Sequence, residues 1–312
     1  MNERALPKAT KVGAALRGRD EFGSTAHAPP IMQGDVAYHA SGLVARALAI
    51  LDDDKRKRDD TPPLRKPYGA AAFATPSIKL QLQRRTLSDG TECWLPIRYF
   101  DVQCLVATFL TGPDEASNLL SGTCLRAVFQ EDGKAVVDLY CIEYRVTDIG
   151  PYNEVGLTIL AEAPGDPIPA NYVVNLPVTT GVAERAGREI WGYNKFVAAI
   201  DVESKGKRFS TILRDRDNEL IAVLDGQRDA SVLAPPADIL TFTLHRGRLM
   251  KTAIRVLTPS QIGGGDDFTL KVGTSKHPMT GNLRTLALDG ARPALIRYAD
   301  PFQALLFPGE AL

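Results

Sequence analysis

Apolar and polar positions alternate along most of the chain after residue 77, in segments that are separated by Gly, Pro, Asp and Asn. Such segments, rich in Val, Ile, Leu, Tyr and Phe, are typical of β-strands. They read, in order, SIKLQLQRRTL, WLPIRYFDVQCLVATFL, AVVDLYCIEYRV, EVGLTILAEA, NYVVNLPV, KFVAAIDVE, RFSTILRD and ELIAVLD. Short polar links such as ESKGK favour antiparallel hairpins. The pattern predicts a mainly β (α+β) fold, an antiparallel curved sheet or β-barrel with a few short helices.

Two segments with helical character interrupt the strands. PDEASNLLSG, residues 113–122, begins with proline and has acidic residues in its first turn. GVAERAGREIWG, residues 181–192, has the length of roughly three helical turns. Neither lies in a G-x-G-x-x-G context, and GGGDD at residues 263–267 precedes no predicted helix, so we interpret it as a flexible turn rather than a phosphate-binding loop.

The first quarter of the chain differs from the rest. We predict an N-terminal extension over residues 1–75, followed by the β domain over residues 76–312. Within the extension, SGLVARALAILDDD has helical spacing with Ser41 as its N-cap. The charge run DDDKRKRDD, residues 52–60, has acids on both sides of its basic centre, so we interpret it as a solvated linker rather than a nucleic-acid patch.

Charge and cysteine usage exclude several classes of protein. Lys and Arg total 37 and Asp and Glu total 37, so no net field attracts nucleic acid or an anionic membrane. The cysteines form no C-x-x-C pair and the histidines no H-E-x-x-H pattern, so we expect isolated buried thiols rather than a zinc site. No signal-peptide core and no run of 18 apolar residues is present, so we expect a soluble cytoplasmic protein.

Lys195 is the first candidate for chemistry, because it lies inside the stretch GREIWGYNKFV. Trp191 and Tyr193 precede it and Phe196 follows it. If this stretch forms a strand, as its composition indicates, both of its faces are apolar. Desolvation disfavours the charged form of a lysine and lowers its pKa from about 10.4, and this frees an amine that can attack a carbonyl. The alternative is a lysine that extends from a strand end to solvent.

A second candidate precedes Lys195 by about forty residues. TDIGPYNEVGLTI places Tyr152 and Glu154 two residues apart at the start of a strand, and therefore on one face. A carboxyl group beside an amine can transfer the protons that carbinolamine formation, dehydration and release require. By itself the stretch PYNE is equally typical of a turn followed by a strand.

The stretches GREIWGYNK and GPYNEVGLTI together resemble the acetoacetate decarboxylase superfamily, in both their order and their separation. SKHPMTGNLRTLALDGARP, residues 275–293, is similar to the C-terminal part of some members, and the resemblance covers roughly residues 85–309. It implies a homo-oligomer. It leaves the N-terminal extension unexplained.

The resemblance also implies roles for residues at matching positions. Lys195 would be the Schiff-base nucleophile and Glu154 the acid/base group, with Tyr152, Tyr193 and Trp191 as pocket neighbours. Arg188 and Glu189 are expected to anchor the helix end through an internal ion pair rather than to contact substrate.

Two positions depart from the family pattern. In the decarboxylases a second lysine follows the nucleophile, whereas Phe196 occupies that position here, so any lowering of the amine's pKa has to come mainly from desolvation. The decarboxylases also hold the substrate carboxylate with an arginine on an early strand, where our alignment places Leu110. Arg98, one strand segment earlier, is the candidate replacement for that cation.

Three functions remain open. The first is decarboxylation of a small β-keto acid, resembling acetoacetate, through an iminium on Lys195. The second is an aldolase or dehydratase that uses the same iminium, which the two departures favour. The third is a non-catalytic binding barrel in which a protonated Lys195 anchors an acidic ligand. No metal or organic cofactor is implied, because the amine itself supplies the electron sink.

Overall fold

The computed structural model of the chain describes residues 82–312. The extension predicted over residues 1–75, with its helix and charged linker, lies outside the described residues.

The described strands form one large sheet, one small sheet and a separate hairpin. The hairpin consists of β1 (Gln83–Thr86) and β2 (Glu92–Leu95). The small sheet contains β8 (Ala199–Lys205), β9 (Arg208–Arg214), β10 (Leu220–Gln227) and β15 (Phe268–Val272). The large sheet contains β3 (Ile97–Thr111), β4 (Arg126–Ala127), β5 (Ala135–Thr147), β6 (Tyr152–Ala163), β7 (Asp166–Asn175), β11 (Ala230–Ala234), β12 (Ile239–His245), β13 (Arg248–Val256), β14 (Ser260–Gly264), β16 (Leu295–Ala299), β17 (Ala304–Leu306) and β18 (Glu310–Ala311). The mainly β fold with a large curved sheet, which the sequence predicts, is confirmed.

The large sheet is almost wholly antiparallel. β3, β5, β6 and β7 follow one another as antiparallel neighbours, and β7 pairs with β12 in parallel through Asn171 and Tyr172. β12 then pairs with β13, β13 with β17, and β17 with β3, so the pairings form a ring. The face of this ring that carries Tyr152 and Glu154 is called the inner face below.

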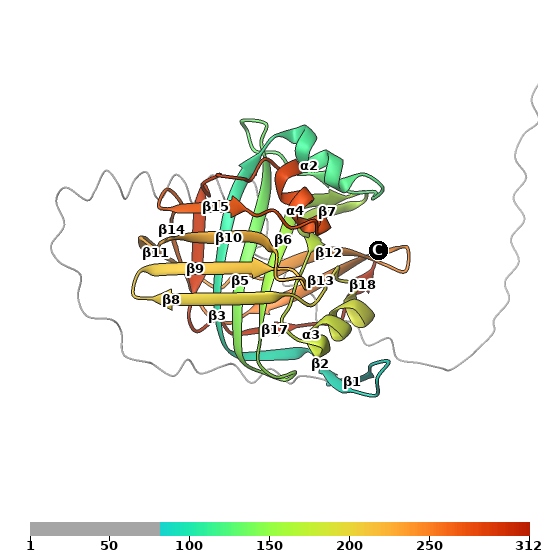
Figure 1. Ribbon diagram of the computed structural model, residues 1–312. Helices are drawn as coiled ribbons and strands as arrows, with labels where there is room; N and C mark the ends of the chain where they lie inside the picture. The colour runs from blue at the N-terminus through green and yellow to red at the C-terminus, as the bar shows by residue number, and fades with distance from the viewer. Residues whose placement is uncertain (1–81) are drawn as a thin grey trace, which may run out of the picture. The chain divides into compact units, whose positions relative to one another are not determined.

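The small sheet packs against the outer face of β3, β5 and β6, and its strands cross theirs (Figure 1). The shared core contains Leu105, Leu139 and Leu157 from the large sheet and Phe209 and Phe268 from the small one, each 0–2% exposed. Crossed sheets that bury alternate side chains in this way make a rigid support. Residues on the opposite, inner face of the large sheet are thereby free to form a site.

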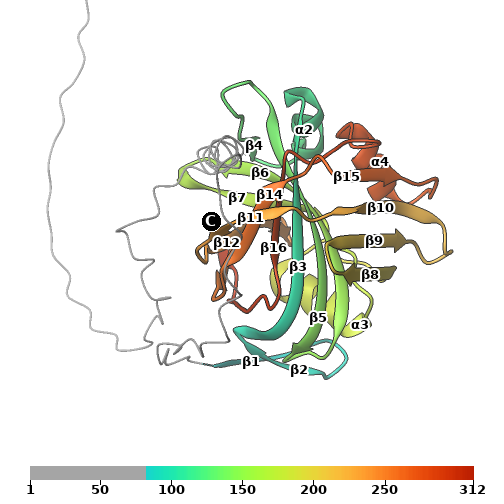
Figure 2. The same cartoon turned by 90° about the vertical axis from the view of Figure 1, so that its left-hand side faces the viewer.

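Four short helical segments occupy the ends of the long strands. They are α2 (Pro113–Leu120), α3 (Gly181–Ala186), the π-helical turn η2 (Gly187–Trp191) and α4 (Pro278–Thr285). α2 and α4 lie at one end and α3 at the other (Figure 2). The two helices expected from the sequence are present, whereas α4 was not expected. The sequence indicates α4 only through a proline in its first turn and His277 as its N-cap. His277 Nδ1 accepts a hydrogen bond from the Met279 amide at 3.2 Å.

Several boundaries differ from the sequence prediction. The expected strand over residues 94–110 is split at Pro96, which has no N–H to donate to a ladder. The sequence predicts a flexible turn over residues 263–267, but Gly263 and Gly264 are the last two residues of strand β14. Cys124 is exposed, so the expectation of buried thiols is wrong there. No helix within residues 82–312 is both long and apolar enough to cross a membrane.

Candidate functional site

Lys195 lies in an irregular segment between η2 and β8, and not in a strand as its sequence context suggested. The chain leaves η2 through Gly192, whose φ of 70° lies in the left-handed region. The next residues run beside residues 176–178, where the Leu176 amide donates to Asn194 O at 3.0 Å and the Ala198 amide donates to Val178 O at 2.9 Å. This backbone pairing fixes the position from which the Lys195 side chain extends.

Glu154 approaches the same segment from the other side. It is the third residue of β6, and it forms an isolated antiparallel bridge with Val178, which also bridges Val197. The side chains of Lys195 and Glu154 meet, with Lys195 Nζ donating to Glu154 Oε2 at 2.5 Å. Each side chain is only 7% exposed. The two residues assigned chemical roles from the sequence therefore form one buried ion pair.

Three tyrosines surround the carboxylate. Tyr144 donates its hydroxyl to Glu154 Oε1 at 3.1 Å, and its ring stacks on Tyr152 at 4.2 Å and contacts Tyr99 at 4.9 Å between centroids. Burial raises the pKa of Tyr99 and Tyr144, and the negative charge of Glu154 raises it further. The hydroxyl groups therefore stay protonated and act as hydrogen-bond donors.

The amine faces two aromatic rings. Lys195 Nζ lies 5.6 Å from the centroid of Tyr152 and 6.0 Å from that of Tyr193, within the range of a cation–π contact. Tyr193 shares a hydrogen bond with Thr241, and Trp191 donates to Phe307 O at 2.7 Å, so both rings are held in place. These aromatic rings cover the amine and leave little room for water beside it.

The space beside the amine, called the Lys195 cavity, is small. Its lining consists of Ile97, Tyr99, Ile149, Tyr152, Ala183, Ala186, Gly187, Trp191, Tyr193, Lys195 and Leu306. The cavity has a volume of about 10 Å³, enough for about one water molecule. A larger ligand therefore requires side chains around the amine to move.

Gly187 lets the lysine pass directly over the helix. A Cβ on Gly187 would lie 2.5 Å from both Cδ and Cε of Lys195, closer than atoms pack. The middle of the lysine side chain, rather than a movable tip, would have to shift. Steric exclusion of a side chain therefore explains why the GREIWGYNK stretch begins with a glycine.

Gly187→Ala is expected to displace the Lys195 amine and to slow its reaction with a carbonyl by about 100-fold, because small misplacements of reacting groups have large kinetic effects. The measurement is the rate of borohydride-trapped adduct formation by intact-protein mass. Gly181→Ala is the matched control, since a Cβ there meets nothing within 4 Å. Equal rates in the two variants would contradict the steric role of Gly187.

Arg188 and Glu189 do not form the internal ion pair expected from the sequence. Arg188 Nη1 donates to the Lys195 carbonyl oxygen at 3.0 Å. Glu189 accepts from the amide of Ser88 at 2.8 Å and from its hydroxyl at 2.5 Å. Both residues anchor this helix end, but each does so through a different part of the chain.

Phe196 points away from the Lys195 cavity. Its ring stacks on that of His277, with 4.0 Å between centroids, and packs against the core shared by the two sheets. Burial lowers the pKa of His277, against the opposing effect of Asp215, so a neutral imidazole is favoured in this stack. Phe196 supports the segment that carries Lys195 but does not line the cavity.

The two residues proposed around the substrate carboxylate also lie elsewhere. Arg98 forms a paired interaction with Asp148, with Arg98 Nη2 at 2.9 Å from Oδ1 and Nε at 3.0 Å from Oδ2, and its side chain is 43% exposed. Its neighbours Ile97 and Tyr99 line the cavity, so Arg98 faces the other side of the strand. Leu110 packs near Val136 and Leu160, away from the amine.

Sequence reasoning missed Arg297, which the strand register places on the inner face. Cross-strand partners share a face, and the row that contains Arg297 continues through Val106, Tyr140 and Gly156. Glu154 belongs to the next row, with Ile142, Cys104 and Ala299. The two rows are separated by two residues along each strand, or roughly 7 Å.

The Arg297 guanidinium makes no hydrogen bond or ion pair with another group described in residues 82–312, although its charge acts on Cys104, Asp138 and Tyr140. Burial raises the pKa of Asp138, against its hydrogen bond from Thr108 at 2.6 Å and the charge of Arg297. A carboxyl group that is more readily neutralised is a weak counter-ion. Arg297 is thus an available cation on the same face as Glu154.

Comparisons with known proteins identify the family and the fold of the chain. The sequence profile of the family described as acetoacetate decarboxylase (ADC) matches residues 85–252, more than half of the chain. That range includes both Glu154 and Lys195. No curated protein sequence matches the chain.

Solved structures show the same fold at low sequence identity. The acetoacetate decarboxylase of Legionella pneumophila has a TM-score of 0.55 and 16% identity, over 77% of this chain and 93% of that one. The enduracididine biosynthesis enzyme MppR in complex with pyruvate has a TM-score of 0.51 and 15% identity, over 70% of this chain and 90% of that one. MppR in complex with the condensation product of pyruvate and imidazole 4-carboxaldehyde has a TM-score of 0.50 and 14% identity, over 80% of this chain and 98% of that one.

Proposed function

Because the chain belongs to the acetoacetate decarboxylase family, we propose that it is a carbon–carbon lyase that forms an iminium between Lys195 and a keto acid, and that it releases carbon dioxide from a β-keto acid. The observation that supports this most directly is the buried Lys195–Glu154 pair at 2.5 Å. An amine and a carboxylate in hydrogen-bond contact at a buried site are the two groups that iminium chemistry requires.

The reaction begins with a proton transfer. The Lys195 ammonium gives a proton to Glu154, and the free amine attacks the ketone carbon of the substrate. A proton then moves from the nitrogen of the adduct to its oxygen. The resulting carbinolamine loses its hydroxyl as water when Glu154 returns the proton, which leaves an iminium cation. The cation then occupies the position of the ammonium, near the rings of Tyr152 and Tyr193 and opposite the Glu154 carboxylate.

The iminium acts as the electron sink. The bond between the α-carbon and the carboxylate breaks, carbon dioxide leaves, and the electron pair moves to the nitrogen and forms an enamine. Protonation of the enamine carbon and addition of water to the regenerated iminium then release the ketone and the Lys195 amine. A carboxylate that is poorly solvated loses carbon dioxide more readily than one in water.

Aldolase or dehydratase chemistry is the second candidate. Its support is that Arg98 is paired with Asp148 and that Leu110 packs away from the amine, so neither holds a carboxylate next to the α-carbon. A structure with the same fold, that of MppR, was solved in complex with the condensation product of pyruvate and imidazole 4-carboxaldehyde. The buried pair serves both reactions equally.

The experiment that tests the proposal is trapping followed by gas analysis. The full chain is incubated with acetoacetate, pyruvate and longer keto acids in the presence of cyanoborohydride, and the adduct is measured by intact-protein mass. We expect a reduced adduct and, without the reductant, release of carbon dioxide from a β-keto acid. An adduct without carbon dioxide would assign the aldolase or dehydratase reaction, and no adduct with any keto acid would overturn both in favour of a non-catalytic binding protein.

We further propose that Arg297 supplies the cation for the acidic end of the substrate. Arg297→Leu is expected to raise the KM for keto acids by about tenfold or more, because a charge-assisted hydrogen bond in a site contributes that much binding. Trapping of the neutral ketone 2-butanone is expected to be unchanged. Arg292→Leu, at an exposed arginine, is the control. Equal losses with the keto acid and the neutral ketone would exclude a role in carboxylate binding.

A further inference from the structure

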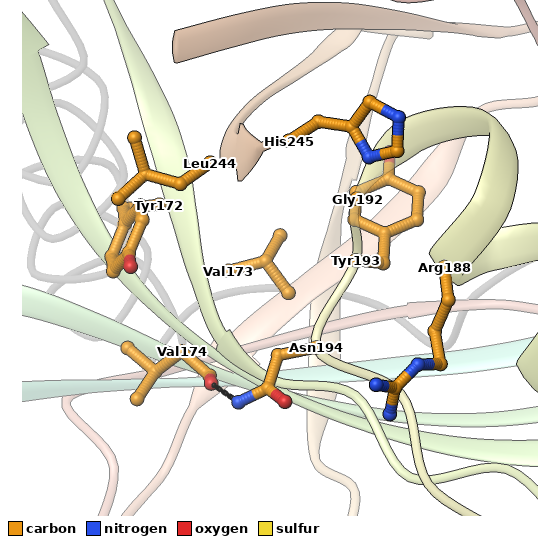
Figure 3. A pocket seen from close by; sticks show the side chains of 9 residues that line it. All are labelled: Tyr172, Val173, Val174, Arg188, Gly192, Tyr193, Asn194, Leu244 and His245. Carbon is orange, nitrogen blue, oxygen red and sulfur yellow. Dashed lines mark hydrogen bonds between the residues drawn. The ribbon is translucent and has the colours of Figure 1, made fainter. Parts of the chain in front are cut away.

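A second cavity adjoins the segment that carries Lys195, and Tyr193 lines both cavities. It has a volume of about 370 Å³ and lies among β7, the end of β12 and residues 188–194 (Figure 3). Volumes of this order hold small organic ligands. It is called the Arg188 cavity below and is defined here by Tyr172, Val173, Arg188, Asn194, Leu244 and His245.

Its polar side chains have the character of an anion site. Among residues 82–312, no acidic residue lines the cavity. Arg188 contributes a guanidinium with five N–H donors. One of these donors makes a hydrogen bond to Lys195 O. Asn194 Nδ2 donates to Val174 O at 2.8 Å, which holds that side chain at the cavity wall, and His245 adds an imidazole. In Figure 3, Arg188 lies on the right of the view, and Tyr172 and Leu244 lie on the left.

The remaining wall is apolar. Tyr172, Val173 and Leu244 contribute hydrocarbon surface, and Leu244 is 39% exposed although it is a large hydrophobic residue. The Arg188 guanidinium donates to Lys195 O but forms no ion pair with a carboxylate of residues 82–312. A cavity with this guanidinium at one side and aliphatic and aromatic surface at the other matches an organic carboxylate, since guanidinium binds carboxylate through paired hydrogen bonds. An inorganic anion would leave the apolar wall uncovered.

The backbone of residues 191 and 192 packs closely against the end of β12 at this cavity. Gly192 has φ of 70°, and a Cβ there would lie 2.5 Å from the Cβ of His245. Thr243 donates to Trp191 O at 2.6 Å, which ties β12 to the end of η2. The walls are therefore joined to one another directly, and Arg188 is joined to the Lys195 carbonyl.

We propose that the Arg188 cavity is a second binding site, next to the Lys195 cavity, for a small organic carboxylate with an apolar or aromatic portion. The ligand carboxylate pairs with the free donors of Arg188, and its apolar portion contacts Tyr172 and Leu244. The proposal does not depend on iminium chemistry, because no carbonyl reaction takes place in this cavity.

Benzoate is the probe for this site, and benzamide is its neutral counterpart of the same shape. Isothermal titration calorimetry on the full chain is expected to show benzoate binding at least about tenfold tighter than benzamide, as a charge-assisted pair implies. Benzoate contains no ketone and cannot form an iminium, so this result is independent of the proposed reaction. Equal binding of the two probes, or no benzoate binding at millimolar concentrations, would overturn the proposal.

Variants locate the site. Arg188→Gln is expected to weaken benzoate binding by about tenfold or more, whereas Arg248→Gln, on the same turn as His245 but outside the lining, is expected to have no effect. Leu244→Asp and Leu244→Asn both remove an apolar contact at an exposed position, so both are expected to weaken benzoate and benzamide. The aspartate variant is expected to weaken benzoate more than the asparagine variant does, and benzamide equally, because only benzoate is repelled by the added charge. Lys195→Met is expected to leave benzoate binding unchanged. Loss of binding in Lys195→Met would place the carboxylate at the lysine instead and would contradict the proposal.

Discussion

Lys195→Met is expected to abolish the borohydride-trapped adduct and to reduce turnover of keto acids by roughly three orders of magnitude or more, because removing the nucleophile of a covalent mechanism removes the pathway itself. Methionine keeps an unbranched, apolar side chain of similar length. The contacts of Lys195 with Gly187, Tyr152 and Tyr193 are therefore largely retained while the amine is lost. Intact-protein mass after trapping and steady-state rates with the same keto acids measure the two effects.

The control for this variant is another lysine in a partly buried ion pair. Lys251 Nζ lies 2.5 Å from Asp166 Oδ2, and each side chain is 15% exposed. Lys251 also lies near an aromatic ring, that of Phe242, at 5.5 Å. Lys251→Met is expected to retain the adduct and the turnover. An adduct that survives Lys195→Met but disappears in Lys251→Met would assign the chemistry to Lys251.

Local patterns in the sequence predict the elements that carry the site, because those elements are specified by nearby residues. β5, β6, β9 and β10 follow the alternation of apolar and polar positions, and the start of β6 at Tyr152 places Glu154 on the same face as the tyrosine. The helix before Lys195 also follows from its local sequence, although its last turn is π-helical. The structure brings Lys195 and Glu154 into contact, and the roles that the resemblance implies for them stay predictions.

Contacts between distant segments escaped the sequence reasoning. Glu189 pairs with Ser88, 101 residues earlier, and no local pattern indicates that partner. Arg297 reaches the inner face only through the register of β16 against β3, and a one-residue slip would move it to the other face. The orientation of Arg98 had a usable signal, however. It alternates with the apolar residues Ile97 and Tyr99, and such alternation indicates that Arg98 faces away from them.

Glu154→Gln is expected to lower turnover by about 10²- to 10⁴-fold, the range for loss of a general acid or base. It is also expected to lower the free energy of unfolding by about 3–5 kcal/mol, because it leaves the Lys195 ammonium buried without its counter-ion. Glutamine keeps an oxygen that can accept the Tyr144 hydroxyl, so the change isolates the lost charge. Urea unfolding at pH 7 and keto acid turnover measure the two effects.

The double variant Glu154→Gln, Lys195→Met separates the pair from its surroundings. Without the ammonium, the unpaired charge is absent, so the double variant is expected to be more stable than Glu154→Gln alone by about 2 kcal/mol or more. If the two single effects on unfolding add within about 0.5 kcal/mol, the groups are not coupled in the folded protein. The same cycle in turnover should be strongly non-additive, since Glu154 acts on an intermediate that only Lys195 can form. Coupling in both cycles would show that one buried contact stabilises the fold and carries the proton of the reaction.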